Sequence, residues 1–314
     1  MPITVVGSIA YDTVTTPFGE RNRMLGGAAV HFALAASFFD EVRVVGPVGE
    51  DFGEAELDVM RHRGVDVSDI ERVQGGRTFF WRGKYGWDLN SRETLDTQLG
   101  VFEGFKPKLS DASRASDVLF LANIQPDLQR EVHEQMAAAR FVALDSMNLW
   151  IEAARDSLVK TISVCDCLTL NDSELRQLTG KASLLAAARE VLSWSPPHPR
   201  VIVAKQGEYG AALITEDGFF SLPAFPLETV MDPTGAGDTF AGGFVGYIAA
   251  HPEEELSDEL LRQAMAHGTA LASFNVEEFG TERVAHLSGP EIVARVRQLR
   301  EFTQFSAAAL PLGE

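Results

Sequence analysis

The sequence predicts an α/β protein: a three-layer α/β/α body with a mainly parallel central sheet and a small β lid. Along most of the 314 residues, short apolar runs that suit buried strands alternate with longer segments of helical spacing. One aromatic, β-prone stretch at residues 72–108 interrupts this alternation. The composition, 45% hydrophobic and 23% charged, excludes disordered, collagen-like and disulfide-scaffold proteins.

The first part of the chain has a strand–helix–strand–helix rhythm. An apolar run at residues 3–7 ends in a glycine and predicts a buried strand. Residues 28–39 are rich in Ala and Phe, follow two glycines, and predict a buried helix. Residues 42–46 predict the next strand. Residues 52–63 have helical spacing and are followed by Gly64, a common helix stop.

Residues 72–108 break this rhythm, and we expect them to form a small antiparallel lid inserted into the body. Residues 78–85 and residues 94–101 are its two extended candidates. A short aromatic sheet beside a large α/β body suits a lid over a cleft, or a contact between two subunits. The predicted organisation is a discontinuous body at residues 1–71 and 109–305, the lid at 72–108, and a C-terminal tail at 306–314.

The alternation resumes after the lid. Strands that alternate with helices predict a parallel sheet covered on both faces, which binds ligands beyond the carboxyl ends of its strands. The predicted strands are residues 118–121, 141–145, 167–171, 201–205 and 211–214. The predicted helices are residues 126–139, 173–178, 184–194, 237–250, 256–274 and 290–305.

The charge of the chain is strongly acidic, with 45 Asp and Glu against 27 Lys and Arg and a net charge of -18. Nucleic acids and anionic membranes require a cationic surface, so neither is predicted as the main partner. Cys165 and Cys167 are predicted to be free thiols in a reducing compartment. The sequence has no apolar segment of bilayer length and no signal-peptide pattern, so it predicts a soluble cytoplasmic protein.

The glycine-rich turn at residues 232–244, DPTGAGDTFAGGF, is the most informative motif. Gly235, Ala236 and Gly237 lead into a predicted helix, and such a turn presents free N–H groups and the positive end of a helix dipole to an anion. Asp238 falls in the first helical turn, where a carboxylate beside a phosphate can take a proton from an attacking hydroxyl. The alternative is a plain turn in which Asp238 only caps the helix.

Signatures of several other enzyme classes are absent. The sequence has no Walker A motif, no GxGxxG after the first strand, no HExxH, no EF-hand loop and no GxSxG elbow. These absences argue against a P-loop ATPase, a nicotinamide-dependent oxidoreductase, a metalloprotease and an α/β-hydrolase.

Five motifs in order resemble the signatures of the ribokinase-like, or PfkB, carbohydrate kinase family. They are LGGAAVHFA at 25–33, VGPVGEDFG at 45–53, LNDSE at 170–174, AKQGEYGA at 204–211, and the turn at 232–244. The resemblance extends from Gly7 to about Phe279. It implies a ribokinase-like fold and phosphorylation of a sugar or nucleoside hydroxyl by ATP with Mg²⁺.

The resemblance also implies roles for single residues. Asp238 is the expected general base, with the amides of Gly235, Ala236 and Gly237 as an anion hole. The expected substrate-binding residues are Asp12, Gly26, Gly27, His31 and the lid residue Arg82. His31 stands where the family commonly has a sugar-binding asparagine, and a satisfied core histidine is the alternative.

The nucleotide side is implied in the same way. The residues expected there are Asn171, Glu174, Lys205, Gly207, Gly210 and Asn275. Glu174 is expected to bind Mg²⁺ through water. Asp232 and Thr234 are expected to contribute to a potassium site found in some members of the family.

The predicted function is therefore transfer of the γ-phosphoryl of Mg-ATP to a sugar hydroxyl. A nucleoside kinase of the same family and a catalytically silent relative that binds sugar or nucleotide are the alternatives. A sugar-phosphate substrate would need a cationic pocket, which Arg82 or Arg92 would supply. We expect a homodimer that forms through the lid.

Overall fold

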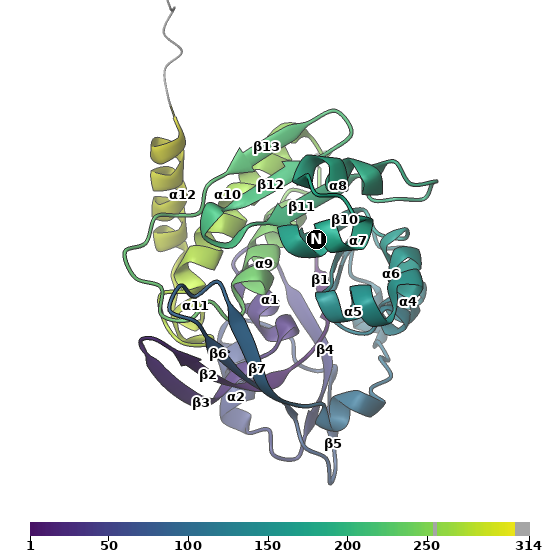
Figure 1. The fold of residues 1–314 in the computed structure, drawn as a ribbon. Helices are drawn as coiled ribbons and strands as arrows, with labels where there is room; N and C mark the ends of the chain where they lie inside the picture. Colours follow the sequence, from purple (N-terminus) through teal and green to yellow (C-terminus); the bar gives the residue numbers. More distant parts are fainter. Residues whose placement is uncertain (254–255, 305–314) are drawn as a thin grey trace, which may run out of the picture.

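A nine-stranded sheet runs through the body of the protein in a computed structural model that describes residues 1–253 and 256–304 (Figure 1). Its strands are β1 (Ile3–Val6), β4 (Val42–Gly49), β5 (Ile70–Val73), β8 (Val118–Leu121), β9 (Phe141–Asp145), β10 (Cys167–Asn171), β11 (Val201–Lys205), β12 (Ala211–Ile214) and β13 (Phe219–Leu222). Their spatial order is β13-β12-β11-β10-β9-β8-β1-β4-β5. Among the described strands of this sheet, only the β11–β12 and β12–β13 pairs are antiparallel, so the predicted mainly parallel sheet is confirmed.

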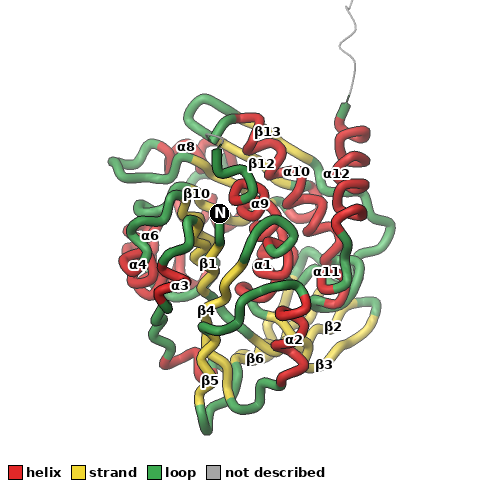
Figure 2. The backbone as a smooth tube through the Cα atoms, turned by 180° about the vertical axis from the view of Figure 1, so that it is seen from behind, coloured by secondary structure: helices red, strands yellow, loops and turns green. Residues whose placement is uncertain are grey.

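Helices cover both faces of this sheet, because its inner strands are apolar on both sides. In β8, Val118 and Phe120 join one core, whereas Leu119 and Leu121 join the other. The first face carries α1 (Ala28–Ala36), α2 (Glu54–His62), α9 (Ala236–Ala249) and α10 (Asp258–Asn275). The second carries α4 (Pro126–Gln135), α5 (Asn148–Ala153), α6 (Arg155–Ile162), α7 (Asp172–Thr179) and α8 (Leu184–Leu192). Figure 2 shows the same layers from behind.

Shorter elements and one outer helix complete the body. They are α3 (Asp111–Arg114), α11 (Glu282–Ala285), α12 (Gly289–Thr303) and the 3₁₀ turns η1 (Gly100–Gly104) and η2 (Gly207–Tyr209). In the described part of the chain, no helix is both long and apolar enough to cross a bilayer. Cys165 and Cys167 are buried free thiols, as predicted.

The lid is a separate four-stranded sheet in the order β3-β2-β6-β7. Its strands are β2 (Ala10–Thr16), β3 (Gly19–Gly26), β6 (Phe79–Tyr85) and β7 (Arg92–Gln98). Residues 72–108 supply only two of these strands, so the predicted lid boundary was incomplete. The pairing of β2 with β6 joins segments almost 70 residues apart, and no local pattern signals such a contact. The predicted tail at 306–314 lies outside the described residues.

Candidate active site

Three neighbouring strands bring polar side chains together at their carboxyl ends. β9 ends at Asp145, β10 at Asn171 and β11 at Lys205, and Asn171 lies opposite Lys205 in the parallel register. Parallel strands place their carboxyl ends at one edge of a sheet, which is where ligands bind in this architecture. Helix α9 begins beside this edge, since Lys205 lies against its first turn at Gly237.

The glycine-rich turn requires a glycine at Gly235. Its φ is 75°, and a Cβ there would lie 2.3 Å from the imidazole of His31. The N–H of Ala236 donates to the Pro233 carbonyl at 3.2 Å. The N–H groups of Gly235 and Gly237 meet no backbone acceptor in residues 1–253 and 256–304. Two of the three predicted anion-hole donors are therefore free to bind a ligand.

Asp238 lies half-buried in the first turn of α9, next to these donors. Burial and the nearby carboxylate of Asp145 raise the pKa of Asp238 to about 7, against the opposing effect of Lys205 and Arg92. A carboxylate with this pKa can exchange a proton near neutral pH, as a general base requires.

Lys205 supplies the positive charge at the floor of the site. Its Nζ lies 2.5 Å from Oδ2 of Asp145, and both side chains are largely buried. Burial lowers the pKa of Lys205, but Asp145, Glu174 and Asp238 together raise it above its ordinary value, so the ammonium stays charged. A Cβ on Gly237 would lie 3.2 Å from this Nζ, which places the ammonium beside the turn.

Asp12 marks the other side of the site, at the start of the lid. Its carboxylate is buried, accepts the N–H of Gly27, and lies so close to Gly26 that a Cβ there would be 2.0 Å from Oδ2. Burial raises the pKa of Asp12 to about 7, and the charges of Asp232 and Asp238 contribute. This electrostatic coupling links the Asp12 side of the site to the glycine turn. Gly26 leaves room for the Asp12 side chain, whereas Gly27 leaves room for the Ser8 carbonyl, from which a Cβ would be 2.4 Å away.

His31 and Asn275 support the glycine turn from behind. Nδ1 of His31 is 3.1 Å from Oδ1 of Asn275, which also accepts the Thr239 hydroxyl at 3.0 Å. Nδ2 of Asn275 donates to the Thr234 carbonyl at 2.8 Å. Burial lowers the pKa of His31, which keeps its imidazole neutral. The contacts of both side chains are within the protein, and their binding of sugar or nucleotide stays a prediction.

Asp232 holds the same turn in place. It is fully buried, and its two oxygens accept the N–H groups of Thr234 at 2.9 Å and Gly280 at 3.0 Å. The Thr234 hydroxyl donates to the hydroxyl oxygen of Tyr85 at 3.2 Å. The lid therefore touches the glycine turn directly. Sequence reasoning missed Tyr85, which carries no motif of its own.

The predicted nucleotide side begins with a capping box. Oδ1 of Asn171 accepts the N–H of Glu174 at 2.7 Å, and Oε2 of Glu174 accepts the N–H of Asn171 at 2.9 Å. Burial raises the pKa of Glu174. Gly207 and Gly210 form the tight turn between β11 and β12, where a Cβ on Gly210 would lie 2.0 Å from the Leu222 carbonyl oxygen.

The sequence named Arg82 as a substrate-binding residue and Arg82 or Arg92 as the source of a cationic pocket, and the strand register separates the two. Arg82 lies opposite Thr13 in the register, whereas Trp81 lies opposite Asp12. Because side chains alternate along a strand, Arg82 lies on the face away from Asp12. On β7, Arg92 lies opposite Tyr85 and so shares the face of Trp81 and Asp12. The strand register, which the sequence did not determine, therefore places Arg92 rather than Arg82 on the face of Asp12.

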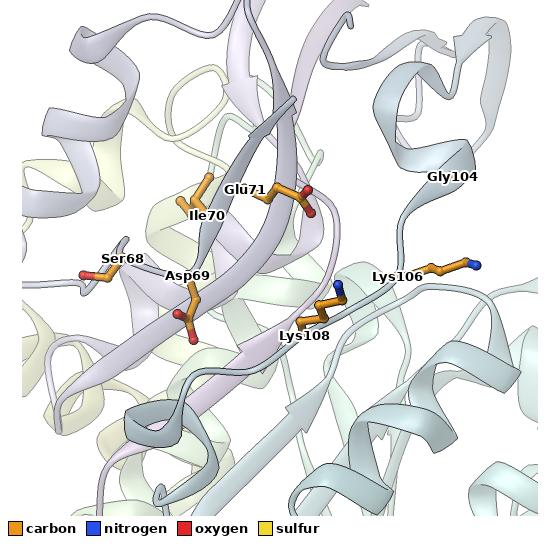
Figure 3. A pocket seen from close by; sticks show the side chains of 7 residues that line it. All are labelled: Ser68, Asp69, Ile70, Glu71, Gly104, Lys106 and Lys108. Atoms are coloured by element: carbon orange, nitrogen blue, oxygen red, sulfur yellow. The ribbon is translucent and has the colours of Figure 1, made fainter. Parts of the chain in front are cut away.

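A surface groove elsewhere on the molecule takes no part in this arrangement. It is lined by Ser68, Asp69, Ile70, Glu71, Gly104, Lys106 and Lys108, near the edge strand β5 (Figure 3). None of the candidate residues lines it. The carboxylate of Asp69 already accepts hydrogen bonds from Ser110 and Ser113.

Comparison with known proteins identifies the family. The model of the pfkB family carbohydrate kinase matches residues 3–286. The chain belongs to this family. As a PfkB kinase, it is a phosphotransferase that acts on a hydroxyl group of a sugar or a nucleoside. The resemblance found in the five motifs is thereby confirmed.

Named relatives of this PfkB kinase include enzymes for nucleosides and for sugars. A cytidine kinase of Thermococcus kodakarensis is 29% identical over 264 residues, which cover 81% of this chain and 91% of that enzyme. The structure of a Burkholderia thailandensis nucleoside kinase with ADP-inosine has a TM-score of 0.77 at 19% identity, and covers 99% of this chain and 100% of that one. Arabidopsis thaliana ribokinase with ribose and ATP has a TM-score of 0.75 at 19% identity, with 94% and 98% covered. The fold is therefore ribokinase-like.

Proposed function

We propose that this PfkB kinase transfers the γ-phosphoryl of Mg-ATP to a hydroxyl on the ribose of a nucleoside, with Asp238 as general base. The observation that carries the proposal is the position of Asp238. It lies half-buried in the first turn of α9 beside the free N–H groups of Gly235 and Gly237, with a pKa of about 7. Asp238 then takes the proton of the attacking hydroxyl, and the turn binds the phosphoryl oxygens.

Asp12 is the acceptor-binding carboxylate in this proposal. It is buried next to the glycine turn, within electrostatic range of Asp238, and can accept hydrogen bonds from two neighbouring sugar hydroxyls. Such an interaction orients one hydroxyl toward the phosphoryl group, which is most of what phosphoryl transfer requires.

The choice of a nucleoside rests on Trp81. The register places its indole on the lid face of Asp12, and the side chain is half-buried. A flat aromatic ring beside a sugar-binding carboxylate suits stacking of a base. The names of the cytidine and nucleoside kinase relatives point the same way. A simple sugar remains the second candidate, because a tryptophan also packs on sugar rings.

Mg²⁺ fits the donors at the edge of the sheet. The described residues hold no group of three or more His, Cys, Asp or Glu that could bind a metal alone. Mg²⁺ commonly binds one or two carboxylates together with nucleotide phosphates, and it neutralises their charge. Glu174 keeps its Oε1 outside the capping box and would contact the waters of the ion, with Asn171 beside it. Lys205 neutralises phosphate charge on the same side.

Potassium would act at the base of the glycine turn. The carboxylate of Asp232 and the carbonyl of Thr234 offer the hard oxygen ligands that such a cation takes, although each already accepts a hydrogen bond. Replacing potassium by tetramethylammonium at constant ionic strength tests this assignment through the rate of ADP release.

The experiment for the main proposal is a screen of ADP release with Mg-ATP against nucleosides, sugars and polyols. We expect turnover with at least one nucleoside and weaker turnover with free ribose. Turnover with a simple sugar alone would overturn the nucleoside assignment. No turnover with any acceptor would favour a catalytically silent relative.

The Asp238→Asn variant tests the base. We expect kcat to fall about 10²- to 10⁴-fold with the accepting nucleoside, because the amide keeps the shape of the carboxylate but takes no proton. Thermal unfolding checks that the variant is folded. A kcat within a few-fold of the wild type would contradict the assignment of Asp238 as the general base.

A further inference from the structure

The inner face of the lid carries a cation that the family comparison does not assign. Arg92 lies directly opposite Tyr85 in the β6–β7 pairing, on the face that also holds Asp12 and Trp81. Gly83 leaves room on this face for the indole of Trp81, since a Cβ on Gly83 would lie 2.1 Å from it. The guanidinium carbon of Arg92 is 5.4 Å from the centre of the Trp81 ring.

This face of the lid rests on both halves of the active site. The Tyr85 hydroxyl accepts the Thr234 hydroxyl of the glycine turn at 3.2 Å. At the tip of the same hairpin, Nδ2 of Asn90 donates to Oε1 of Glu208, in the turn of the predicted nucleotide side, at 2.8 Å. The hairpin therefore contacts both the glycine turn and the predicted nucleotide side, and Arg92 lies level with the first of these contacts, opposite Tyr85.

The charge of Arg92 reaches carboxylates on three separate elements. It lowers the pKa of Asp12 on β2, Glu174 on α7 and Asp238 on α9. Arg92 therefore lies within electrostatic range of all three carboxylates. The ion pairs of the described residues do not include Arg92, whereas Lys205 is paired with Asp145. The Arg92 guanidinium hydrogen-bonds the Tyr85 side chain and is paired with none of the three carboxylates, so its remaining donors can bind an anion.

We propose that Arg92 is a catalytic residue that binds the phosphoryl group while it passes from ATP to the acceptor. The inference rests on the proposed kinase function. The acceptor oxygen forms a bond to the γ-phosphorus, the bond to the β–γ bridging oxygen breaks, that oxygen leaves with ADP, and Asp238 receives the hydroxyl proton. Arg92 donates N–H groups to the phosphoryl oxygens and neither gains nor loses a covalent bond. In this proposal Arg92 of the lid and the glycine turn contact the same phosphoryl group from opposite sides.

Kinetics with a neutral acceptor test the proposal directly. In Arg92→Gln we expect kcat for the accepting nucleoside to fall about 10²- to 10³-fold, with the acceptor KM changed less than about threefold, because the lost contact acts on the transferred group. Arg92→Lys keeps the charge but not the planar fork, and is expected to regain part of the rate. The matched control is Lys84→Gln, an exposed cation on the opposite face of the same hairpin, whose rate should stay at the wild-type level.

A binding measurement gives a second readout. MgADP with fluoroaluminate and the nucleoside mimics the phosphoryl in transfer, and transition-state analogues bind far more tightly than substrates. Calorimetry should show this mixture binding at least about tenfold more weakly to Arg92→Gln than to the wild type, with MgADP alone bound equally by both.

The outcomes separate this inference from the proposed function. No ADP release by the wild type would contradict the kinase function itself. Normal kcat and normal fluoroaluminate binding in Arg92→Gln would overturn only the role of Arg92. A defect confined to KM for a phosphorylated acceptor, such as a ribose phosphate, would also overturn it and assign Arg92 to the acceptor's own phosphate.

Discussion

At the residue scale, the site is organised by carboxylates whose proton affinities are raised. Asp12 and Asp238 both have a pKa of about 7, chiefly because burial penalises their charged forms. Asp145 has a raised pKa for the same reason, although its pair with Lys205 opposes the shift. A cleft with these carboxylates tolerates an incoming phosphate only if it also holds cations, and Lys205 and Arg92 supply positive charge here.

These pKa values predict the acid limb of the pH profile. Asp238 accepts a proton only when ionised, so kcat/KM should fall as the pH drops below about 7 and level off above it. The measurement is kcat/KM from pH 5.5 to 9 with the accepting nucleoside. In Asp238→Asn, the residual kcat/KM should no longer fall as the pH drops below about 7. A wild-type profile that stays flat down to pH 5.5 would contradict the assigned base.

At the element scale, the carboxyl edge of the sheet and the lid contribute different halves of the site. The strand ends and the glycine turn of α9 follow from local patterns, and each lies where the sequence predicts it. Local patterns do not predict which side chains lie on the inner face of the lid, because a shift of one residue in register moves every side chain of a strand to the other face. That is why the sequence favoured Arg82 and the structure favours Arg92.

The contact between the lid and the glycine turn yields a prediction of its own. In Tyr85→Phe the Thr234 hydroxyl loses its partner, and a hydrogen bond contributes about 0.5–1.5 kcal/mol. We expect the acceptor KM to rise about two- to tenfold, because the lid is held less firmly over the cleft. Steady-state kinetics measure this change.

Tyr11→Phe is the matched control. It removes a hydroxyl that donates to Oε1 of Glu56 at 3.0 Å on the other side of the same sheet. Its acceptor KM should stay at the wild-type value. If both variants raise KM equally, the effect belongs to the stability of the lid rather than to its contact with the turn.

At the scale of the whole molecule, apolar side chains are exposed on the lid. Phe18, Trp87, Leu95 and Leu99 lie in or beside its strands, and Trp87 is 89% exposed. Exposed apolar groups of this kind commonly mark an interface. We therefore predict that two copies of the chain associate through their lids.

Light scattering after size exclusion tests the predicted dimer. The wild type should have twice the mass of the chain, and Leu95→Asp should shift the mass toward that of a monomer. Val293→Asp changes an exposed apolar residue on α12, outside the lid, and should leave the mass unchanged. A monomeric wild type would refute the prediction.

The sequence by itself determined the layered body and the position of the glycine-rich turn at the start of a helix. Apolar runs and helical spacing are local, and so is the left-handed backbone that requires a glycine at Gly235. Only the tertiary structure decided what surrounds that turn. It paired β2 with β6, brought Asp12 and Arg92 to one face, and placed His31 and Asn275 behind the turn. Those contacts join residues far apart in the chain, so they depend on packing and strand register, which no local pattern contains.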